Sequence, residues 1–193
     1  MSFVRSAKEA ARHFLHRNGL GSILRTVRNW RGEKTGYLDE PNLRDRFSRI
    51  YREEVWIKAS DAPASGEGSS LRATENLRAE MPKLFSAIGV QSILDVGCGD
   101  LTWIMSMDLP QTYTGIDIVP SVIEANKTRY PDRTFFCLDA TVDAMPRADM
   151  VICREVLFHL SFADGRKVIE NLKCSGTRYF LQRRTVRRRS TAT

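Results

Sequence analysis

The sequence predicts an α/β fold in which about five parallel strands form one sheet, preceded by an N-terminal helical arm. From residue 92 onward, short apolar runs end at glycine, aspartate or polar turns, and helical stretches at 101–107, 120–129 and 163–173 separate most of them. Apolar runs that alternate with helices are typical of parallel strands, because each helix carries the chain back across the sheet. The runs expected as strands are residues 93–96, 113–116, 134–138, 150–153 and 179–181.

The composition is that of an ordinary globular protein. With 193 residues, 42% hydrophobic and 27% charged, the chain can bury a core in one domain with an appendage. These values exclude a disordered chain, a collagen-like chain and a disulfide scaffold. The four cysteines lack the CxxC spacing of a zinc site, and no long apolar segment or secretory leader is evident. We therefore expect reduced cysteines, no metal site and a cytoplasmic location.

The positive charge is concentrated at the two ends of the chain. Residues 1–34 carry eight basic and two acidic side chains, and residues 183–193 carry five arginines and no acid. The body between them, residues 35–182, has 17 basic and 21 acidic residues, although the whole chain has a net charge of +7. The high isoelectric point therefore does not indicate a nucleic-acid-binding body. It leaves peripheral binding of acidic surfaces through the basic ends as one interpretation.

Three segments are expected. Residues 1–42 are a basic amphipathic helical arm and linker, whose apolar stripe could lie on a membrane surface or pack on the protein's own body. Residues 43–182 are the main domain, and it begins with helices at about 43–56 and 71–87, the second kinked or broken at Pro82. Residues 183–193 are a basic tail.

A glycine-rich turn follows the first expected strand, in the sequence Asp95-Val-Gly-Cys-Gly99. Gly97 and Gly99 allow a tight turn and a close approach of the backbone to a ligand. Free N–H groups and a following helix N-terminus would favour a carboxylate or phosphate there. Asp117 ends the second strand, where a carboxylate can accept both hydroxyls of a ribose, and Asp139 ends the third strand, close enough to cap an adenine amine. The pattern predicts a nucleoside-containing ligand.

Two kinds of cofactor fit such a turn. A dinucleotide site needs a third glycine in G-x-G-x-x-G, and that position is Thr102. Asp95 and Asp100 would also repel a diphosphate. A zwitterionic methionine group suits this acidic loop better.

At these residues the chain resembles the class I S-adenosylmethionine-dependent methyltransferases. Residues 47–182 look more narrowly like a bacterial branch of methyltransferase-domain proteins. The segments that carry the resemblance are Ile50-Tyr51, Trp56, Ser65-Gly-Glu-Gly-Ser69, residues 94–103, residues 115–120, Asp139, residues 148–161 and Ser175-Gly176. The resemblance implies a Rossmann-like methyltransferase sheet of strand order 3-2-1-4-5 with S-adenosylmethionine as the cofactor.

The resemblance also implies roles for single residues. The cofactor-binding set is Asp95, Gly97, Cys98, Gly99, Asp117, Ile118, Asp139, Ala140 and Arg154. Gly97 and Gly99 would face the methionine part, Asp95 would hold the loop and help to bind the ammonium, and Asp117 would take the ribose. Asp139 and Ala140 would take the adenine. Arg154 would hold an acidic group, with a solvated charge as the alternative.

The chain departs from the family pattern at two points. Leu101 stands where class I motifs often carry a third glycine, which predicts a tighter cofactor loop. The family sheet usually ends in a hairpin beside strand five, and residues 183–193 do not read as one. We therefore expect a truncated or frame-shifted product, or an unusual short member, with strand five as an edge open to self-association.

The expected function is S-adenosylmethionine-dependent methyl transfer to a small-molecule or glycan-like acceptor. Glu155 and His159 follow strand four, are spaced to share a helical face, and are the candidates for removing the acceptor's proton. Helix packing or capping is the alternative role for His159. Nucleic-acid amino methylation is disfavoured, because residues 152–155 lack an Asn/Asp-Pro-Pro-aromatic run. A catalytically impaired cofactor-binding protein remains the alternative function.

Overall fold

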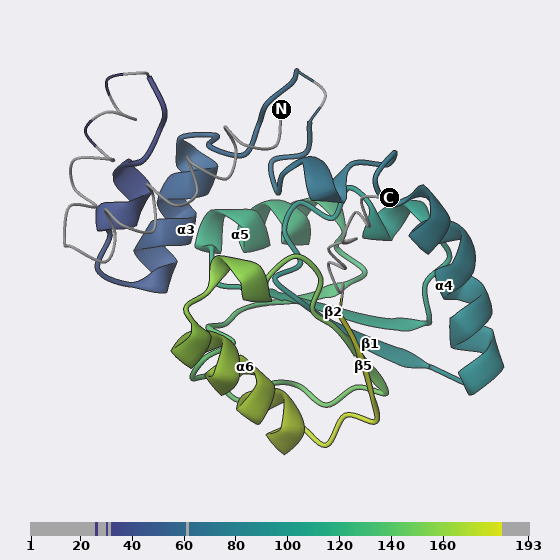
Figure 1. The fold of residues 1–193 in the computed structure, drawn as a ribbon. Helices are drawn as coiled ribbons and strands as arrows, with labels where there is room; N and C mark the ends of the chain where they lie inside the picture. Colours follow the sequence, from purple (N-terminus) through teal and green to yellow (C-terminus); the bar gives the residue numbers. More distant parts are fainter. Residues whose placement is uncertain (1–25, 27–29, 31, 61, 183–193) are drawn as a thin grey trace, which may run out of the picture.

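One parallel sheet organises the computed structural model, which describes residues 26, 30, 32–60 and 62–182 (Figure 1). The strand order is β3-β2-β1-β4-β5, and every neighbouring pair is parallel. The predicted order 3-2-1-4-5 is therefore confirmed. The strands are β1 (Ser92–Val96), β2 (Thr112–Asp117), β3 (Thr134–Cys137), β4 (Met150–Ile152) and β5 (Tyr179–Leu181).

Within residues 32–60 and 62–182, four α-helices surround the sheet, and their labels follow Figure 1. They are α3 (Leu43–Arg52), α4 (Glu75–Ile88), α5 (Pro120–Arg129) and α6 (Phe162–Cys174). The side chains of Asn42 and Ser161 accept hydrogen bonds from backbone N–H groups in the first turns of α3 and α6, which satisfies donors that a helix start leaves unpaired. Pro120 begins α5, where its missing N–H costs nothing.

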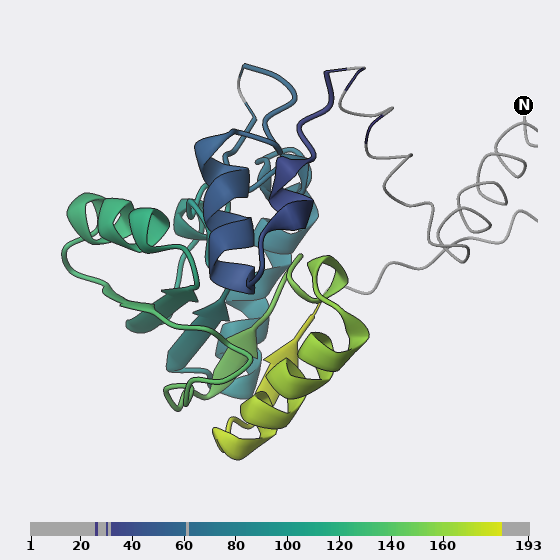
Figure 2. The ribbon, with the colours of Figure 1, turned by 90° about the vertical axis from the view of Figure 1, so that its left-hand side faces the viewer.

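The core has two layers, one on each face of the sheet. Along β1, Ile93 packs on the α4 side with Met81 and Phe85, whereas Leu94 packs on the α6 side with Val168. This alternation follows from the two-residue period of a strand, and both faces are apolar because helices cover both. Figure 2 shows α6 and α5 on opposite sides of the sheet. The arrangement leaves the carboxyl ends of the strands free to build a site.

Three predicted helices differ from the structure. The predicted helix at 101–107 is wrong, since only a short 3-10 turn (Ile104–Ser106) forms there after Leu101 adopts a left-handed backbone (φ +62°). The helix predicted at 43–56 ends at Arg52, just before a second left-handed residue, Glu54. Helix α4 begins at Glu75 and continues through Pro82, because residues buried on either side of the proline hold both halves against the sheet.

Most of the predicted arm and all of the predicted tail, residues 183–193, lie outside the described residues. Of the arm, the structure describes the exposed Trp30 and the segment from residue 32 onward. That segment forms a 3-10 turn (Gly36–Asp39), and Arg49 of α3 donates hydrogen bonds to Gly36 O (3.0 Å) and Glu40 Oε1 (2.9 Å). Among the helices that the structure describes, none has the length and apolarity to cross a membrane.

Candidate functional site

A pocket with about 640 Å³ of empty space lies at the carboxyl ends of β1, β2 and β4. The strand order reverses between β1 and β4, which is where open α/β sheets place their ligands. Loops that follow these strands form its floor, and residues 47–69 cover it. The lining residues are Phe47, Tyr51, Trp56, Ser65, Ser69, Asp95, Gly97, Cys98, Trp103, Asp117, Ile118, Arg154, Glu155, Val156 and His159.

A second pocket, with about 370 Å³ of empty space, adjoins the first at the ends of β2 and β3. It contains the predicted adenine residues Asp139 and Ala140, together with Thr141 and Leu138. The residues that line both pockets are Phe47, Gly97, Asp117, Ile118 and Val156. A single elongated ligand can therefore occupy both pockets and pass Asp117 at their junction.

Asp117 is held rigidly at that junction. Its carboxylate accepts hydrogen bonds from the backbone N–H groups of Gly99 and Val119, each at 3.0 Å. Burial raises the pKa of Asp117, and these backbone donors oppose the rise. A carboxylate has about four lone-pair sites, so Asp117 keeps acceptor capacity for a ligand hydroxyl beside these backbone donors.

The backbone donors of the glycine loop are already used within the protein. Gly97 N–H and Cys98 N–H both donate to Ile116 O, at 2.8 and 3.0 Å, and Gly99 N–H donates to Asp117. The expected free N–H groups are therefore absent from residues 97–99, and no α-helix follows directly. A Cβ on Gly97, whose φ is +69°, would lie 2.4 Å from Val156 Cγ2.

Asp95 is buried on the floor of the first pocket. The hydroxyl of Tyr113 donates to its Oδ2 at 2.8 Å. Burial raises the pKa of Asp95, the Tyr113 hydrogen bond and Arg154 lower it and the neighbouring Asp117 raises it, which together give a pKa of about 7. Asp95 can thus be charged when a cation approaches.

At the far end of the second pocket, Asp139 forms a tight turn. Its Oδ1 accepts from Thr141 N (2.9 Å) and Thr141 Oγ1 (2.7 Å), and its own N–H donates to Asp143. These bonds fix the side chain that the sequence assigned to an adenine amine.

Cys98 and Arg154 both reach the first pocket from buried positions. Burial raises the pKa of the Cys98 thiol well above its usual range, so this group lines the pocket as a neutral side chain. Arg154 is 8% exposed, donates to Gly68 O at 2.6 Å and lies over the Trp103 ring at 5.2 Å. The alternative of a solvated charge at Arg154 is therefore wrong.

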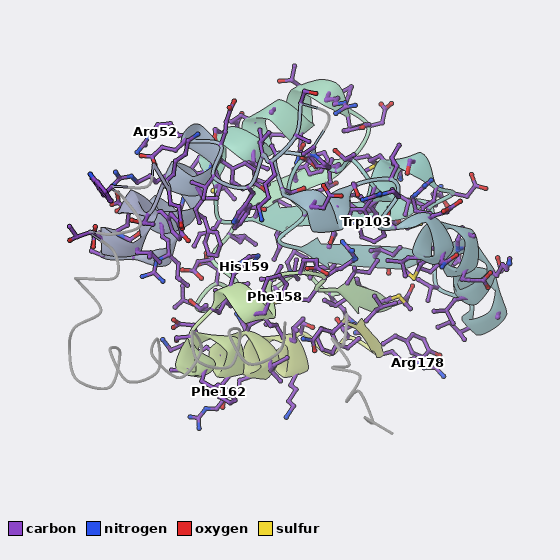
Figure 3. The ribbon with its side chains drawn as sticks, turned by 45° about the horizontal axis from the view of Figure 1, so that its top comes forward. Arg52, Trp103, Phe158, His159, Phe162 and Arg178 are labelled. Carbon is purple, nitrogen blue, oxygen red and sulfur yellow. The ribbon has the colours of Figure 1, made fainter. Side chains whose placement is uncertain are left out.

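Glu155 and His159 reach the same pocket without sharing a helix. Glu155 has a left-handed backbone (φ +60°), and His159 ends a separate 3-10 turn (Leu157–His159), so the predicted common helical face is wrong. The His159 ring stacks on Trp56, with centroids 4.8 Å apart. Burial lowers the pKa of His159 while Glu155 opposes the fall, which favours a neutral imidazole. Figure 3 shows His159 near the middle of the molecule and Phe162 at its edge.

The residues that cover the pocket received no roles from the sequence. Phe47, Tyr51 and Trp56 form an aromatic wall with His159. Ser65 ties this cover to the glycine loop, since its N–H and hydroxyl both donate to Asp100 at 3.0 Å. Ile50-Tyr51, Trp56 and Ser65-Gly-Glu-Gly-Ser69 carried the family resemblance, and that was the signal that could have placed them in the site.

No group of His, Cys, Asp and Glu side chains within the described part of the chain could hold a metal ion. The site is built from a glycine loop and acidic strand ends at the reversal point of a parallel sheet, an arrangement typical of α/β domains that bind nucleotide-like ligands.

The comparisons with known proteins give this domain a family. Residues 93–174 match the family model described as a methyltransferase domain. The match covers 82 of the 193 residues, and for this segment the resemblance to class I S-adenosylmethionine-dependent methyltransferases that the sequence motifs indicated is confirmed. No curated protein sequence matches the chain.

Several solved structures are similar to this chain at low sequence identity. N-methyltransferase NodS from Bradyrhizobium japonicum WM9, in complex with S-adenosyl-L-homocysteine, is 19% identical with a TM-score of 0.49, over 64% of this chain and 65% of that one. The methyltransferase domain of bacterial CtHen1 is 17% identical (TM-score 0.44, 51% and 58%). Phosphoethanolamine N-methyltransferase 1 of Haemonchus contortus is 19% identical (TM-score 0.47, 71% and 30%). The chain spans less than two thirds of each of these proteins.

Proposed function

We propose that the chain binds S-adenosylmethionine across the two adjoining pockets and transfers its methyl group to a small-molecule or glycan-like acceptor. The observation that carries the proposal is the position of Asp117, a residue that lines both pockets. A ligand with a ribose between two unlike ends fits this arrangement. The methionine end would lie over Gly97 and Asp95, and the adenine end beside Asp139 and Ala140.

The residues at each end suit the group assigned to them. Asp95 offers a carboxylate to the ammonium, and Arg154 offers a buried guanidinium to the carboxylate of the methionine part. Ile118 and Leu138 give the second pocket apolar walls, and Asp139 gives it a hydrogen-bond acceptor. Val156 packs against Gly97 so closely that no side chain fits at this position, which keeps the glycine loop compact beside the pocket.

S-adenosylmethionine supplies a methyl group activated by a sulfonium, so the chain's own task is alignment, exclusion of water and proton removal. Phe47, Tyr51 and Trp56 wall the pocket against water. His159, held against Trp56, would accept a proton from an acceptor hydroxyl or amine, because burial keeps its imidazole neutral. Glu155, on the same pocket wall, would stabilise the imidazolium that forms.

Two measurements test this function in sequence. Calorimetric titration with S-adenosylhomocysteine tests the cofactor site, and Asp117→Ala should weaken binding while Asp132→Ala, at an exposed turn, should not. Formation of S-adenosylhomocysteine from S-adenosylmethionine is then followed with a panel of sugars, phenols and amines. Binding without turnover on any acceptor would favour a cofactor-binding protein without catalysis. A parent chain that binds no S-adenosylhomocysteine would overturn the proposal.

A further inference from the structure

A buried tyrosine lies directly behind the first pocket without lining it. Tyr113, in β2, is 2% exposed, and its hydroxyl donates to Asp95 Oδ2 at 2.8 Å. Its ring is fixed at 63° to the ring of Phe135, with centroids 6.2 Å apart. The orientation of this hydroxyl is therefore set by the core of the protein, and its one proton points at a pocket carboxylate.

We propose that Tyr113 is a positioning residue that orients Asp95 and maintains its negative charge, so that Asp95 can hold the cofactor's ammonium group near neutral pH. The inference rests on the proposed function, because it assigns the ammonium of S-adenosylmethionine to Asp95. It adds a residue outside the pocket that controls the affinity of the site and its dependence on pH.

The sheet register makes this contact possible. Asp95 lies opposite Gly115 of β2, and Tyr113 lies two residues before Gly115, on the same face of the strand. A Cβ at Gly115 would lie 2.9 Å from Phe135 and 3.1 Å from Cys98 Sγ, so the position is filled by its neighbours.

The groups around Asp95 decide its charge. Tyr113 and Asp117 face it from β2, Cys98 from the glycine loop, and Cys153 and Arg154 from the segment after β4. The two thiols are neutral because burial raises their pKa values. Burial and Asp117 raise the pKa of Asp95, to about 7, against the lowering by the Tyr113 hydrogen bond and Arg154. Both forms of Asp95 therefore coexist near neutral pH.

The sign of the effect follows from this balance. An ammonium ligand binds better to charged Asp95, so affinity should rise with pH through the pKa of Asp95 and level off above it. Loss of the tyrosine hydroxyl removes a donor that favours the charged form, and the pKa moves up. At a pH below the pKa of Asp95, each increase of one unit in this pKa weakens binding by up to about tenfold. At a pH well above the pKa, binding changes little.

The test is calorimetric titration of the full chain with S-adenosylhomocysteine between pH 6 and 8.5. Tyr113→Phe keeps the ring and removes only the hydroxyl, and it should move the rise in affinity to higher pH. Asp95→Asn should abolish the rise, and in that background Tyr113→Phe should leave the pH profile unchanged. Tyr179→Phe is the matched control, because within the described residues its hydroxyl makes no hydrogen bond.

Proton release measured in buffers of different ionisation enthalpy gives a second readout. The parent should release protons on binding near pH 7, and Asp95→Asn should release fewer. A uniform loss of affinity at every pH in Tyr113→Phe would mean a purely structural role and would overturn the inference, as would a parental pH profile in Asp95→Asn. Absence of binding in the parent would instead contradict the proposed function.

Discussion

The carboxylate of Asp117 accepts a 3.0 Å hydrogen bond from the backbone N–H of Gly99, which joins the end of β2 to the loop that follows β1. Asp117 also lines both pockets. One residue thus shapes the glycine loop and, in the proposed function, would contact the ligand.

Replacement of Asp117 should therefore affect the ligand more than the fold. Asp117→Ala removes charge-assisted hydrogen bonds worth about 1.5–3 kcal/mol, and we expect S-adenosylhomocysteine to bind about ten- to a hundredfold more weakly. Asp117→Asn, which retains one acceptor oxygen, should fall between the alanine variant and the parent. Calorimetric titration measures this order, and equal affinity in all three proteins would remove Asp117 from the site.

Gly97→Ala should destabilise the chain for two separable reasons. The left-handed backbone costs an alanine about 1–2 kcal/mol, and the new Cβ overlaps Val156 Cγ2, which adds about 1–3 kcal/mol. The double variant Gly97→Ala/Val156→Ala removes the overlap and leaves the backbone strain. The parent, the two single variants and the double variant form a double-mutant cycle. Denaturant unfolding of these four proteins should give a coupling free energy above about 0.5 kcal/mol in magnitude, in the range seen for contacting residues. Additive effects would show that the two residues do not clash.

Leu101 combines a buried side chain with a left-handed backbone. We therefore expect its glycine variant to be more stable than its alanine variant, which is the reverse of the usual order. Ordinarily alanine is more stable than glycine by about 0.5–1 kcal/mol inside an element. At φ +62° glycine has no strain, so Leu101→Gly should unfold at a higher urea concentration than Leu101→Ala. Both should be less stable than the parent, by about 2–5 kcal/mol for the alanine variant, because Leu101 is 1% exposed. An alanine variant more stable than the glycine variant would contradict the left-handed assignment.

Asp100 ties the pocket cover to the glycine loop, and its removal should loosen both. It accepts from Ser65 N and Ser65 Oγ at 3.0 Å and from Thr102 N at 3.1 Å. Asp100→Ala should lower the free energy of unfolding more than Ser65→Ala, because only the first change leaves all three donors without their acceptor. Amide hydrogen exchange should rise in residues 62–70 and 97–103 of Asp100→Ala, while α6 stays protected. Unchanged exchange at residues 62–70 would show that other contacts hold the cover.

His159 should make stability depend on pH in a defined direction. Burial lowers its pKa from the usual 6.5, so below that pH the unfolded chain binds more protons than the folded protein. The contribution of neutral His159 to the free energy of unfolding is therefore complete above about pH 6.5, and it is lost as the pH falls toward the lowered pKa of the folded protein. Urea unfolding of His159→Phe between pH 5 and 8 should give a flatter profile than the parent. In the methyl-transfer assay the same variant should retain cofactor affinity and lose about 10²–10⁴-fold in rate if His159 is the base.

The parallel sheet and the position of the cofactor loop were predictable from local sequence alone. Buried parallel strands are short apolar runs, and the runs ending at Val96, Asp117 and Cys137 also placed the acidic strand ends. The glycines of the loop were readable because left-handed backbone conformations favour glycine. The absence of the helix predicted at 101–107 could not be foreseen, because Leu101 adopts a left-handed backbone conformation without being glycine.

Tertiary structure alone decided how the site is completed. It brought Tyr51, Trp56 and Ser65 over a loop more than thirty residues later in the chain, and it buried Arg154, which the sequence could not distinguish from a surface charge. It also paired Tyr113 with Asp95 across two strands. The sequence by itself determined the fold class and the acidic strand ends, because these depend on local hydrophobic periodicity and backbone preference, whereas the strand order was predicted from the family resemblance. The contacts that set charge, orientation and enclosure depend on burial and on neighbours distant in sequence, and only the folded chain defines those.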